Sequence, residues 1–437
     1  MLLPPRVSDW VPPGHVAWFV IGVVERLDLS GICGAYRVDG VGRPAYDPAM
    51  MVALVLYSYA QGCTSARGIA RRCVEDVPSR MIAANQTPDH STLSRFRDAH
   101  AETLSELFFQ VLALCRDAGM LRVGMVAVDS TKLAADASLS ANMSYEQLRE
   151  LARSVVAEAG EVDAAEDAAY GEARGDELPE ELADPARRPA RIEEMLERLA
   201  EREAELAAER DRRRAPALAA DPDGDGAGGP ARRPGRAPMP GLTARERDRL
   251  VKTKFNATDP GSGIVRHRGM LMQGYNVQTA VDEGQVILAV RATATSPDHG
   301  QLEPMVAQAK ANLDRVGVSD PVGVVVADSG YWTNHQIQGL TKQGLRVLVP
   351  PIDRHARDPD REAVEVQQMR AALARPAGHQ AYRRRQQMIE PVFAHIKHIR
   401  QITRIRRRGR RAAQAEIDLI ATTHNLLKLF RHAPTTA

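Results

Sequence analysis

LRVGMVAVDST, residues 121–131, is a continuous apolar run that ends in a carboxylate. The run is bounded by Gly124 and ends at Asp129, which is the pattern of a central strand buried on both faces of a sheet. A second run of this kind, PVGVVVADSGYW at 321–332, delivers Asp328. A carboxylate at the end of a buried strand is costly unless a cation or hydrogen-bond donors compensate for its lost hydration. Both aspartates are therefore candidate site residues.

Helices and strands alternate in the second half of the chain. YNVQTAVDE at 275–283 and QVILAVRATAT at 285–295 predict a hairpin that turns near Glu283. The segments that follow predict a helix over 301–317, the strand that ends in Asp328, a helix over 334–344, a strand over 345–352 and a helix around Glu390. This order predicts an α/β fold, a mixed sheet flanked by helices.

Residues 1–120 have the pattern of an all-α domain. Asp47 stands where the N-cap of one helix would be, directly before a proline. Further on, PDHSTLSRFRDAH predicts a short helix capped by Ser91. A helix-turn-helix built from this segment would turn Arg95 and Arg97 outward, toward phosphates and base edges in a major groove. An ordinary helical hairpin is an equally good interpretation.

The middle of the chain differs in composition from both ends. Residues 158–184 carry eleven Asp or Glu against one Arg, residues 191–214 predict a long charged helix, and a Pro/Gly-rich stretch follows. We therefore expect a helical and disordered insertion that interrupts one fold. The expected division is a helical DNA-binding domain at 1–120, a catalytic core at 121–139 and 251–432, and the insertion at 140–250.

RRRQQMIEPVFAHIKHIRQITRIRRRGRR, residues 383–411, holds eleven Lys or Arg and a single acid, Glu390. The net charge of +2 hides this segregation, which indicates a nucleic-acid partner. Two strand-end aspartates and a helical glutamate predict a three-carboxylate site for a hard cation such as Mg²⁺. Two such ions about 4 Å apart stabilise the attacking and leaving oxygens of a phosphodiester. Taken singly, each acid also has a structural interpretation, as a turn cap or a helix-surface ion pair.

Four blocks of the sequence resemble, in order, the blocks typical of bacterial DDE insertion-sequence transposases, which have a ribonuclease-H-like catalytic core. The blocks are VDSTKLAADAS at 128–138, NATDPGSGIVRHRGMLMQGYNVQTAVDE at 256–283, ADSGYW at 327–332 and RRRQQMIEPVFAHIK at 383–397. The segment from Tyr46 to Ala99 resembles the N-terminal domain that accompanies this core. The resemblance covers most of the chain outside 140–250.

The resemblance implies that Asp129, Asp328 and Glu390 are the catalytic acids. They would also be the metal ligands, holding two Mg²⁺ ions for which Mn²⁺ substitutes. The implied function is a DNA transposase that binds the terminal repeats of its insertion sequence, cleaves phosphodiester bonds and joins 3′-hydroxyl ends to target DNA. Its implied partners are the element ends and target DNA, with a homodimer on paired ends. A structure-specific nuclease on the same fold is one alternative, and a domesticated DNA-binding regulator without catalysis is another.

The family often carries a Tyr-x2-Arg-x3-Glu-x6-Lys signature around the last acid. Glu390 and Lys397 keep this spacing, and so do Tyr382 and Arg385, but four residues rather than three separate Arg385 from Glu390. One extra residue rotates a helical side chain by about 100°. The resemblance implies that Lys397 contacts DNA near the cleaved bond, and Tyr382 and Arg385 are further candidate DNA contacts.

Two other residues leave alternatives open. Trp332, expected to be exposed after ADSGY, would stack on an unpaired base, although core packing is the favoured interpretation. Asp298, in TSPDHGQL, would add a ligand or a proton relay, although capping the helix that begins near Gln301 is favoured. The sequence contains neither a nucleotide-binding loop nor a zincin helix, so ATPase and metalloprotease functions are excluded.

Cysteine usage and hydropathy indicate the compartment. The four cysteines form no CxxC pair and are expected to be buried free thiols in a reducing environment. The most apolar stretch, at 49–60, is too short to span a bilayer, and the N-terminus lacks a signal-peptide pattern. We expect no membrane partner and a cytoplasmic, nucleoid-associated protein.

Overall fold

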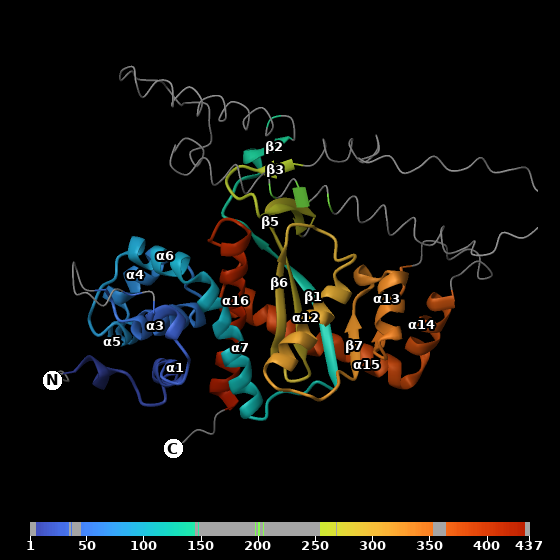
Figure 1. Ribbon diagram of the computed structural model, residues 1–437, viewed down its shortest axis with the longest axis horizontal. Coiled ribbons are helices and arrows are strands. Elements are labelled where there is room, and N and C mark those ends of the chain that lie inside the picture. The colour runs from blue at the N-terminus through green and yellow to red at the C-terminus, as the bar shows by residue number, and fades with distance from the viewer. Residues whose placement is uncertain are drawn as a thin grey trace, which may run out of the picture. The chain divides into compact units, whose positions relative to one another are not determined.

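The structure in Figure 1 is a computed structural model, and it describes residues 6–34, 36, 45–144, 254–267, 269–352 and 364–432, with a few single positions between 145 and 250. The chain divides into two compact units, Met1–Asp136 together with Ile264–Ala437, and Ala137–Gly263. The expected acidic run, charged helix and Pro/Gly-rich stretch of the insertion lie outside the described residues, apart from those single positions.

The larger unit is built on a mixed sheet. Its strands are β1 (Met125–Ala134), β4 (Gly263–His267), β5 (Met270–Asp282), β6 (Ile287–Thr293), β7 (Val324–Ala327) and β8 (Arg346–Leu348). They lie in the order β4-β5-β1-β7-β8, and β6 also pairs with β5. β1 is antiparallel to β5 and parallel to β7, and β7 is parallel to β8. The mixed sheet and the hairpin of β5 and β6 are as the sequence predicts.

β1 is the central strand, and it is longer than expected. Val126, Ala127 and Val128 are fully buried, as predicted for a strand covered on both faces. The strand nevertheless continues beyond Asp129, because the long strand β5 pairs with it as far as Ala134. The expectation that Asp129 ends its strand is therefore wrong.

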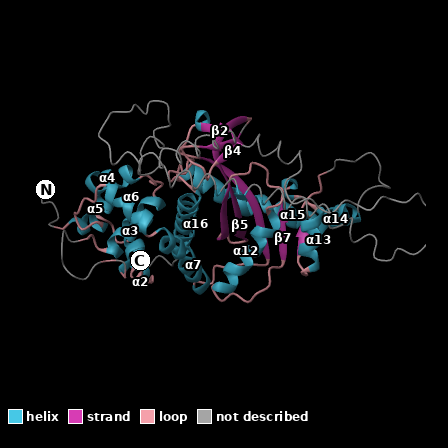
Figure 2. Cartoon of the chain, turned by 45° about the horizontal axis from the view of Figure 1, so that its top comes forward, coloured by secondary structure: helices cyan, strands magenta, loops and turns pink. Residues whose placement is uncertain are grey.

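Helices flank the sheet and complete the unit, as predicted. They are α12 (Leu302–Arg315), the 3-10 turn η3 (Ser329–Tyr331), α13 (Asn334–Lys342), α14 (Val364–Ala374), α15 (Pro376–Ala394), the π-helical turn η5 (His395–Ile399) and α16 (Arg410–His432). α15 contacts β1, β5 and β7, whereas α12 contacts β5, β6 and β1. Figure 2 shows the strands running between α16 and α13.

The N-terminal part of the same unit is helical, as expected. Its elements are η1 (Val7–Trp10), α1 (Val16–Val24), α2 (Ser30–Cys33), α3 (Pro48–Ala60), α4 (Ala66–Glu75), α5 (Val77–Ile82), α6 (His90–Ala99) and α7 (Ala101–Asp117). Asp47 caps α3 by accepting a hydrogen bond from the Met50 amide at 2.7 Å. The cap of α6 is Asp89 rather than Ser91, because the Asp89 carboxylate accepts from both the amide and the hydroxyl of Thr92.

A buried arginine joins the N-terminal helices to α16. Arg400 is 4% exposed, and its guanidinium donates to the Tyr59 carbonyl at 2.8 and 3.2 Å and to the Ile420 carbonyl at 3.0 Å. Burial lowers the pKa of Arg400 to about 9. The backbones also meet closely, because a Cβ added to Gly62 (φ +77°) would lie 1.9 Å from the Arg400 carbonyl oxygen.

Other cations of the basic run are also used inside the protein. Arg407 is 8% exposed and donates to Asp98 at 2.7 Å, while Arg404 and Arg408 pair with Asp136 at 3.5 and 3.2 Å. These side chains fasten the segment after η5 to α6 and to the end of β1. The sequence indicated that the basic run binds DNA. Some of its arginines instead stabilise the fold.

The smaller unit contains the two borders of the insertion. After the 3-10 turn η2 (Leu139–Ala141), β2 (Asn142–Ser144) pairs antiparallel with β3 (Lys254–Asn256). The Asn256 amide group also donates to the Ser138 carbonyl at 2.8 Å. The described residues on either side of the insertion are therefore neighbours in one small sheet.

The structure tests the expected burial of the cysteines and bears on the expected absence of a membrane span. Cys73 and Cys115 are buried free thiols, as predicted, but Cys33 is exposed at the end of α2, so burial was wrongly expected for it. Among the described helices, none combines the length and apolarity needed to cross a membrane.

We expect Arg400→Ala to destabilise the fold by about 3 kcal/mol, because it leaves two buried carbonyls without their donor. The matched control is Arg406→Ala, which removes an exposed guanidinium from the same run and should leave the free energy of unfolding nearly unchanged. Chemical denaturation followed by circular dichroism measures both. Equal effects of the two substitutions would contradict the structural role of Arg400.

Candidate active site

The two strand aspartates lie side by side although they are far apart in the sequence. β1 and β7 are parallel, and their last paired residues are Val128 and Ala327. Asp129, within β1, and Asp328, directly after β7, are the next residues along the chain. Parallel neighbours in a sheet are about 4.8 Å apart. The structure therefore brings together two of the three predicted acids.

Asp129 is held by one amide and one cation. Its Oδ1 accepts from the Ser130 amide at 2.7 Å, and its Oδ2 accepts from Arg385 Nη1 at 2.5 Å. The side chain of Asp129 is 20% exposed and that of Arg385 is 12% exposed. Burial raises the pKa of Asp129 to about 6 and the negative charge of Asp328 adds to this rise, whereas Arg385 and the Ser130 amide oppose it.

Asp328 is placed by the turn that follows β7. It is the N-cap of η3, and its Oδ1 accepts from the Gly330 amide at 2.9 Å. The strand therefore positions the backbone of Asp328, and the cap positions its side chain. The sequence allowed Asp328 to be a turn cap instead of a site residue. In the structure Asp328 caps the turn and also lies beside Asp129.

Glu390 is an exposed residue of α15. It lies on α15 next to the buried residues Met388 and Ile389, yet it is itself exposed and forms no ion pair with a described residue. The expected alternative, an ion pair with a cation of its own helix, is thus not seen. In the part of the chain that the structure describes, no three or more His, Cys, Asp or Glu side chains are grouped to hold a metal ion.

Arg385 pairs with Asp129, the first predicted acid. The five-residue separation on α15 places the Arg385 and Glu390 side chains about 140° apart around the helix axis. The Arg385 side chain points toward β1 and pairs with Asp129. Its guanidinium carbon lies 5.8 Å from the centre of the Tyr382 ring. The extra residue in the signature therefore does not remove Arg385 from the site.

Lys397 is tied to β1 on the same side of the sheet. Its Nζ donates to Thr131 Oγ1 at 2.9 Å and to the Lys132 carbonyl at 3.0 Å. Thr131 and Asp129 are two residues apart on a strand, so their side chains share a face. Lys397 and Arg385 thus approach this face from η5 and α15, next to Asp129.

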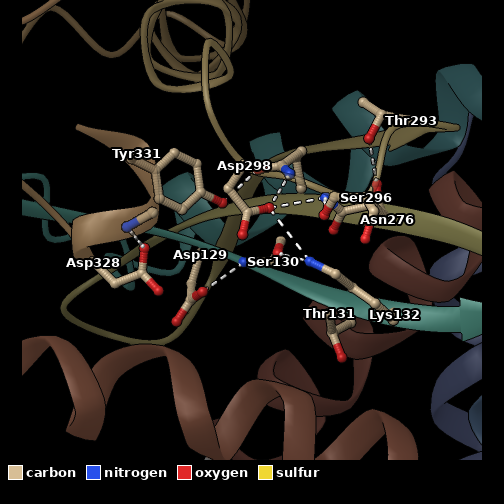
Figure 3. A network of polar contacts seen from close by, with 12 residues as sticks. Asp129, Ser130, Thr131, Lys132, Asn276, Thr293, Ser296, Asp298, Asp328 and Tyr331 are labelled. Carbon is tan, nitrogen blue, oxygen red and sulfur yellow. Dashed lines mark hydrogen bonds and ion pairs between the residues drawn. The ribbon is translucent and has the colours of Figure 1, made fainter. Parts of the chain in front are cut away.

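The opposite face of β1 carries a second polar network (Figure 3), which includes Ser130, Lys132, Asn276, Asp298 and Tyr331. Asp298 Oδ1 accepts from Asn276 Nδ2 at 2.8 Å and lies 3.5 Å from Lys132 Nζ. Asp298 does not cap α12, which has no side-chain cap, so the favoured interpretation of this residue was wrong. The alternating polar residues of the NVQ segment on buried β5 were the available signal for this network.

Two predicted DNA contacts are buried. Trp332 is 7% exposed and its indole nitrogen donates to Asn334 Oδ1 at 2.9 Å, so the expected exposure is wrong and core packing is supported. Arg97 is 4% exposed and donates to the Tyr59 hydroxyl at 3.0 Å and to the Thr64 carbonyl at 2.7 Å. Its outward orientation was wrongly predicted because α6 turns this position toward α3.

Arg95 keeps the orientation expected of a DNA contact. It is exposed on α6, where its Nε lies 3.4 Å from the Ser91 carbonyl. Arg95 and Arg97 are two residues apart, so they point in directions about 200° apart on a helix. Only one of the pair can face outward.

Comparison with known protein families gives two matches. Residues 5–99 match the family described as "Transposase domain (DUF772)", and residues 253–426 match the family described as "Transposase DDE domain". No curated protein and no solved structure matches the chain.

The two matched ranges together span more than half of the chain and stop on either side of the insertion. Asp328 and Glu390 lie within the DDE range, whereas Asp129 lies between the two ranges. The pairing of β1 with β5 and β7 supplies the missing connection, because it builds Asp129 into the same sheet. A DDE domain implies a ribonuclease-H-like fold, in agreement with the mixed sheet and its flanking helices. The chain belongs to the insertion-sequence-type DDE transposases.

Proposed function

We propose that this transposase binds the ends of its own insertion sequence, cleaves phosphodiester bonds there and joins the freed 3′-hydroxyl to target DNA. The observation that carries this proposal is the placement of Asp129 beside Asp328 on neighbouring parallel strands, with a cation already on Asp129. Two adjacent carboxylates in a partly buried position repel each other, and a cation relieves that repulsion. Asp129, Asp328 and Glu390 are the proposed catalytic acids.

The donor chemistry of the site fits a hard divalent ion. Carboxylate oxygens are the ligands that Mg²⁺ and Mn²⁺ prefer, and burial of Asp129 raises the cost of leaving it without a positive partner. Asp129 and Asp328 would hold the ions, and Glu390 would complete the set from α15. When bound, two Mg²⁺ ions would stabilise the attacking and leaving oxygens of the phosphodiester.

The cations around the aspartates have proposed roles on DNA. Arg385 neutralises Asp129 in the free protein, and we propose that it turns to a DNA phosphate when a divalent ion takes over that neutralisation. Lys397, anchored to β1, would hold the phosphate next to the cleaved bond, with Tyr382 beside Arg385. Such contacts position the backbone without reading its sequence.

The N-terminal helices are proposed to recognise the element ends, with Arg95 as a contact. We further propose a homodimer on paired ends and a cytoplasmic, nucleoid-associated location, where the DNA substrate is found. A structure-specific nuclease would cleave the same ends but would not join strands. A DNA-binding regulator would do neither, so a combined cleavage and joining assay separates the three functions.

We expect Glu390→Gln to abolish cleavage of a labelled element end at saturating Mg²⁺ while DNA binding persists or tightens, because the charge is lost and the size is kept. Asp129→Asn and Asp328→Asn should behave alike, since a two-metal site fails when any of its carboxylates is lost. Removal of divalent ions with EDTA should stop the wild-type reaction reversibly. Gel electrophoresis of nicked and joined products measures all four effects.

Glu25→Gln is the matched control, because Glu25 is also an exposed glutamate without an ion pair to a described residue. This variant should cleave and join at the wild-type rate. If the Glu390→Gln protein did the same, Glu390 would be a surface residue without a catalytic role.

Arg385→Gln should bind Mn²⁺ more tightly than the wild type in the absence of DNA, because Asp129 loses the cation that competes with the metal. The same variant should cleave poorly, since a phosphate contact is lost. Arg383→Gln, which removes an exposed guanidinium from the same helix, is the control. Isothermal titration calorimetry with Mn²⁺ tests the first expectation, and unchanged or weaker affinity would contradict it.

Arg95→Ala should weaken binding to element ends and reduce the slope of log K against log salt by about one, the loss of one phosphate contact. Arg97→Ala should instead lower the melting temperature, because it leaves the Thr64 carbonyl and the Tyr59 hydroxyl without their donor. A salt titration of DNA affinity and a thermal melt distinguish the two. An unchanged salt slope for Arg95→Ala would remove α6 from the DNA interface.

A further inference from the structure

We propose that Asp298 is a positioning residue for the candidate active site, which fixes the turn that carries Asp328 against β1 through Gln278 and Tyr331. This proposal rests on the proposed function, because it assigns a role in shaping the same acidic site. Asp298 itself is not proposed as a metal ligand.

Asp298 is anchored from three directions. Its Oδ1 accepts from Asn276 Nδ2 and from Gln278 Nε2, both at 2.8 Å, and Lys132 Nζ lies 3.5 Å away. Asp298 and Lys132 each have 16% of the side chain exposed, so the ion pair is largely shielded from water. The Lys132 ammonium also donates to Ser130 Oγ at 2.9 Å. One carboxylate oxygen thus gathers donors from both β1 and β5.

The network continues from Gln278 into the turn that holds Asp328. The Tyr331 hydroxyl donates to Gln278 Oε1, and the Tyr331 ring is fully buried. Tyr331 is the last residue of η3, the same turn that Asp328 caps. Burial raises the pKa of Tyr331, and the negative charges of Asp298, Asp129 and Asp328 add to that effect, so the hydroxyl keeps its proton and acts as a donor.

Asp298 and Asp328 both come close to Gly330. A Cβ added to Gly330 would be 3.1 Å from Asp328 Oδ1 and 3.7 Å from Asp298 Oδ2. Figure 3 shows Asp298 on the side of β1 that carries Ser130 and Lys132, and Asp328 in the turn that carries Tyr331. The donors on Asp298 compensate its charge, so a carboxylate close to the Asp328 turn is not left without polar partners.

The network restrains the chain directly after the last residue of β7 that pairs with β1. β7 pairs with β1 only as far as Ala327, so no ladder hydrogen bond holds Asp328 to β1. Beyond that point, the buried Tyr331 and its link to Gln278 and Asp298 restrain the turn. Small displacements of a metal ligand weaken metal binding and catalysis, because both depend on a fixed coordination geometry. Asp298 would therefore control how closely the Asp328 carboxylate is matched to that of Asp129.

The test compares two single variants, Asp298→Asn and Tyr331→Phe, with the double variant. The first removes the charge that holds Lys132, and the second removes only the hydroxyl that connects η3 to Gln278. Each should raise the Mn²⁺ concentration for half-maximal cleavage by about tenfold, with the rate largely recovered at saturating Mn²⁺. The double variant should be no worse than the more affected single variant, because both interrupt one chain of hydrogen bonds.

Two substitutions serve as matched controls. Asp314→Asn removes an exposed aspartate at the end of α12, and Tyr59→Phe removes another buried tyrosine hydroxyl, the one that Arg97 donates to. Tyr59→Phe should lower the melting temperature without changing the Mn²⁺ requirement. That contrast separates a loss of stability from a loss of site geometry.

Calorimetric titration of Mn²⁺ into each DNA-free protein gives a readout that does not depend on activity. Weaker Mn²⁺ binding by both variants with native circular dichroism would support the proposal. An unchanged Mn²⁺ affinity in both variants would overturn it. So would an Asp298→Asn protein that binds no Mn²⁺ at any concentration while Tyr331→Phe binds normally. If Asp298→Asn did not fold, Tyr331→Phe alone would decide.

The result that would reject the proposed function differs from the result that would reject the role of Asp298. Wild-type protein that neither cleaves nor joins element ends, or a Glu390→Gln protein that does both, would reject the assigned chemistry whatever the Asp298 variants show. The calorimetric comparison still measures the effect of Asp298 on the two aspartates in that case.

Discussion

The pairing of β1 with β7 is the constraint on which the candidate site depends. Parallel pairing in register up to Val128 and Ala327 leaves Asp129 and Asp328 as neighbours, although the insertion and the five described strands β2 to β6 separate them in the sequence. Parallel strands require a crossover between them, so a long intervening segment is compatible with this arrangement. β5 then extends β1 beyond Asp129, which places the acid inside the sheet rather than at its edge.

The alternation of side chains along β1 divides its polar residues between two tasks. Asp129 and Thr131 face α15 and η5, where Arg385 and Lys397 reach them. Ser130 and Lys132 face the other side, where Lys132 donates to Ser130 and lies beside Asp298. One face thus presents charge for the proposed chemistry and the other supports it, and both follow from the period of two in a β-strand.

The basic run has more than one function. Arg400 and Arg407 are buried and fasten the segment after η5 to the N-terminal helices, while Arg385 neutralises Asp129. A buried guanidinium suits this task because it has five donors and serves several carbonyl or carboxylate oxygens at once. The charge pattern indicated a DNA partner, and the family agrees, but the pattern could not distinguish internal arginines from those available to a phosphate.

The sequence by itself determined the class of fold, the helical N-terminal part and the family, and it singled out both aspartates as candidates, because apolar periodicity, caps and motif order are local properties of the chain. Only the tertiary structure decided which charged side chains meet. Arg97 and Trp332 carry no local sign of burial, since burial depends on helices and strands that are distant in sequence. The contact of Arg385 with Asp129 and the three donors around Asp298 likewise arise only when β1, β5 and α15 are brought together. Glu390 was singled out by motif order, but its exposure on α15 depends on how that helix packs against the sheet, which no local pattern shows.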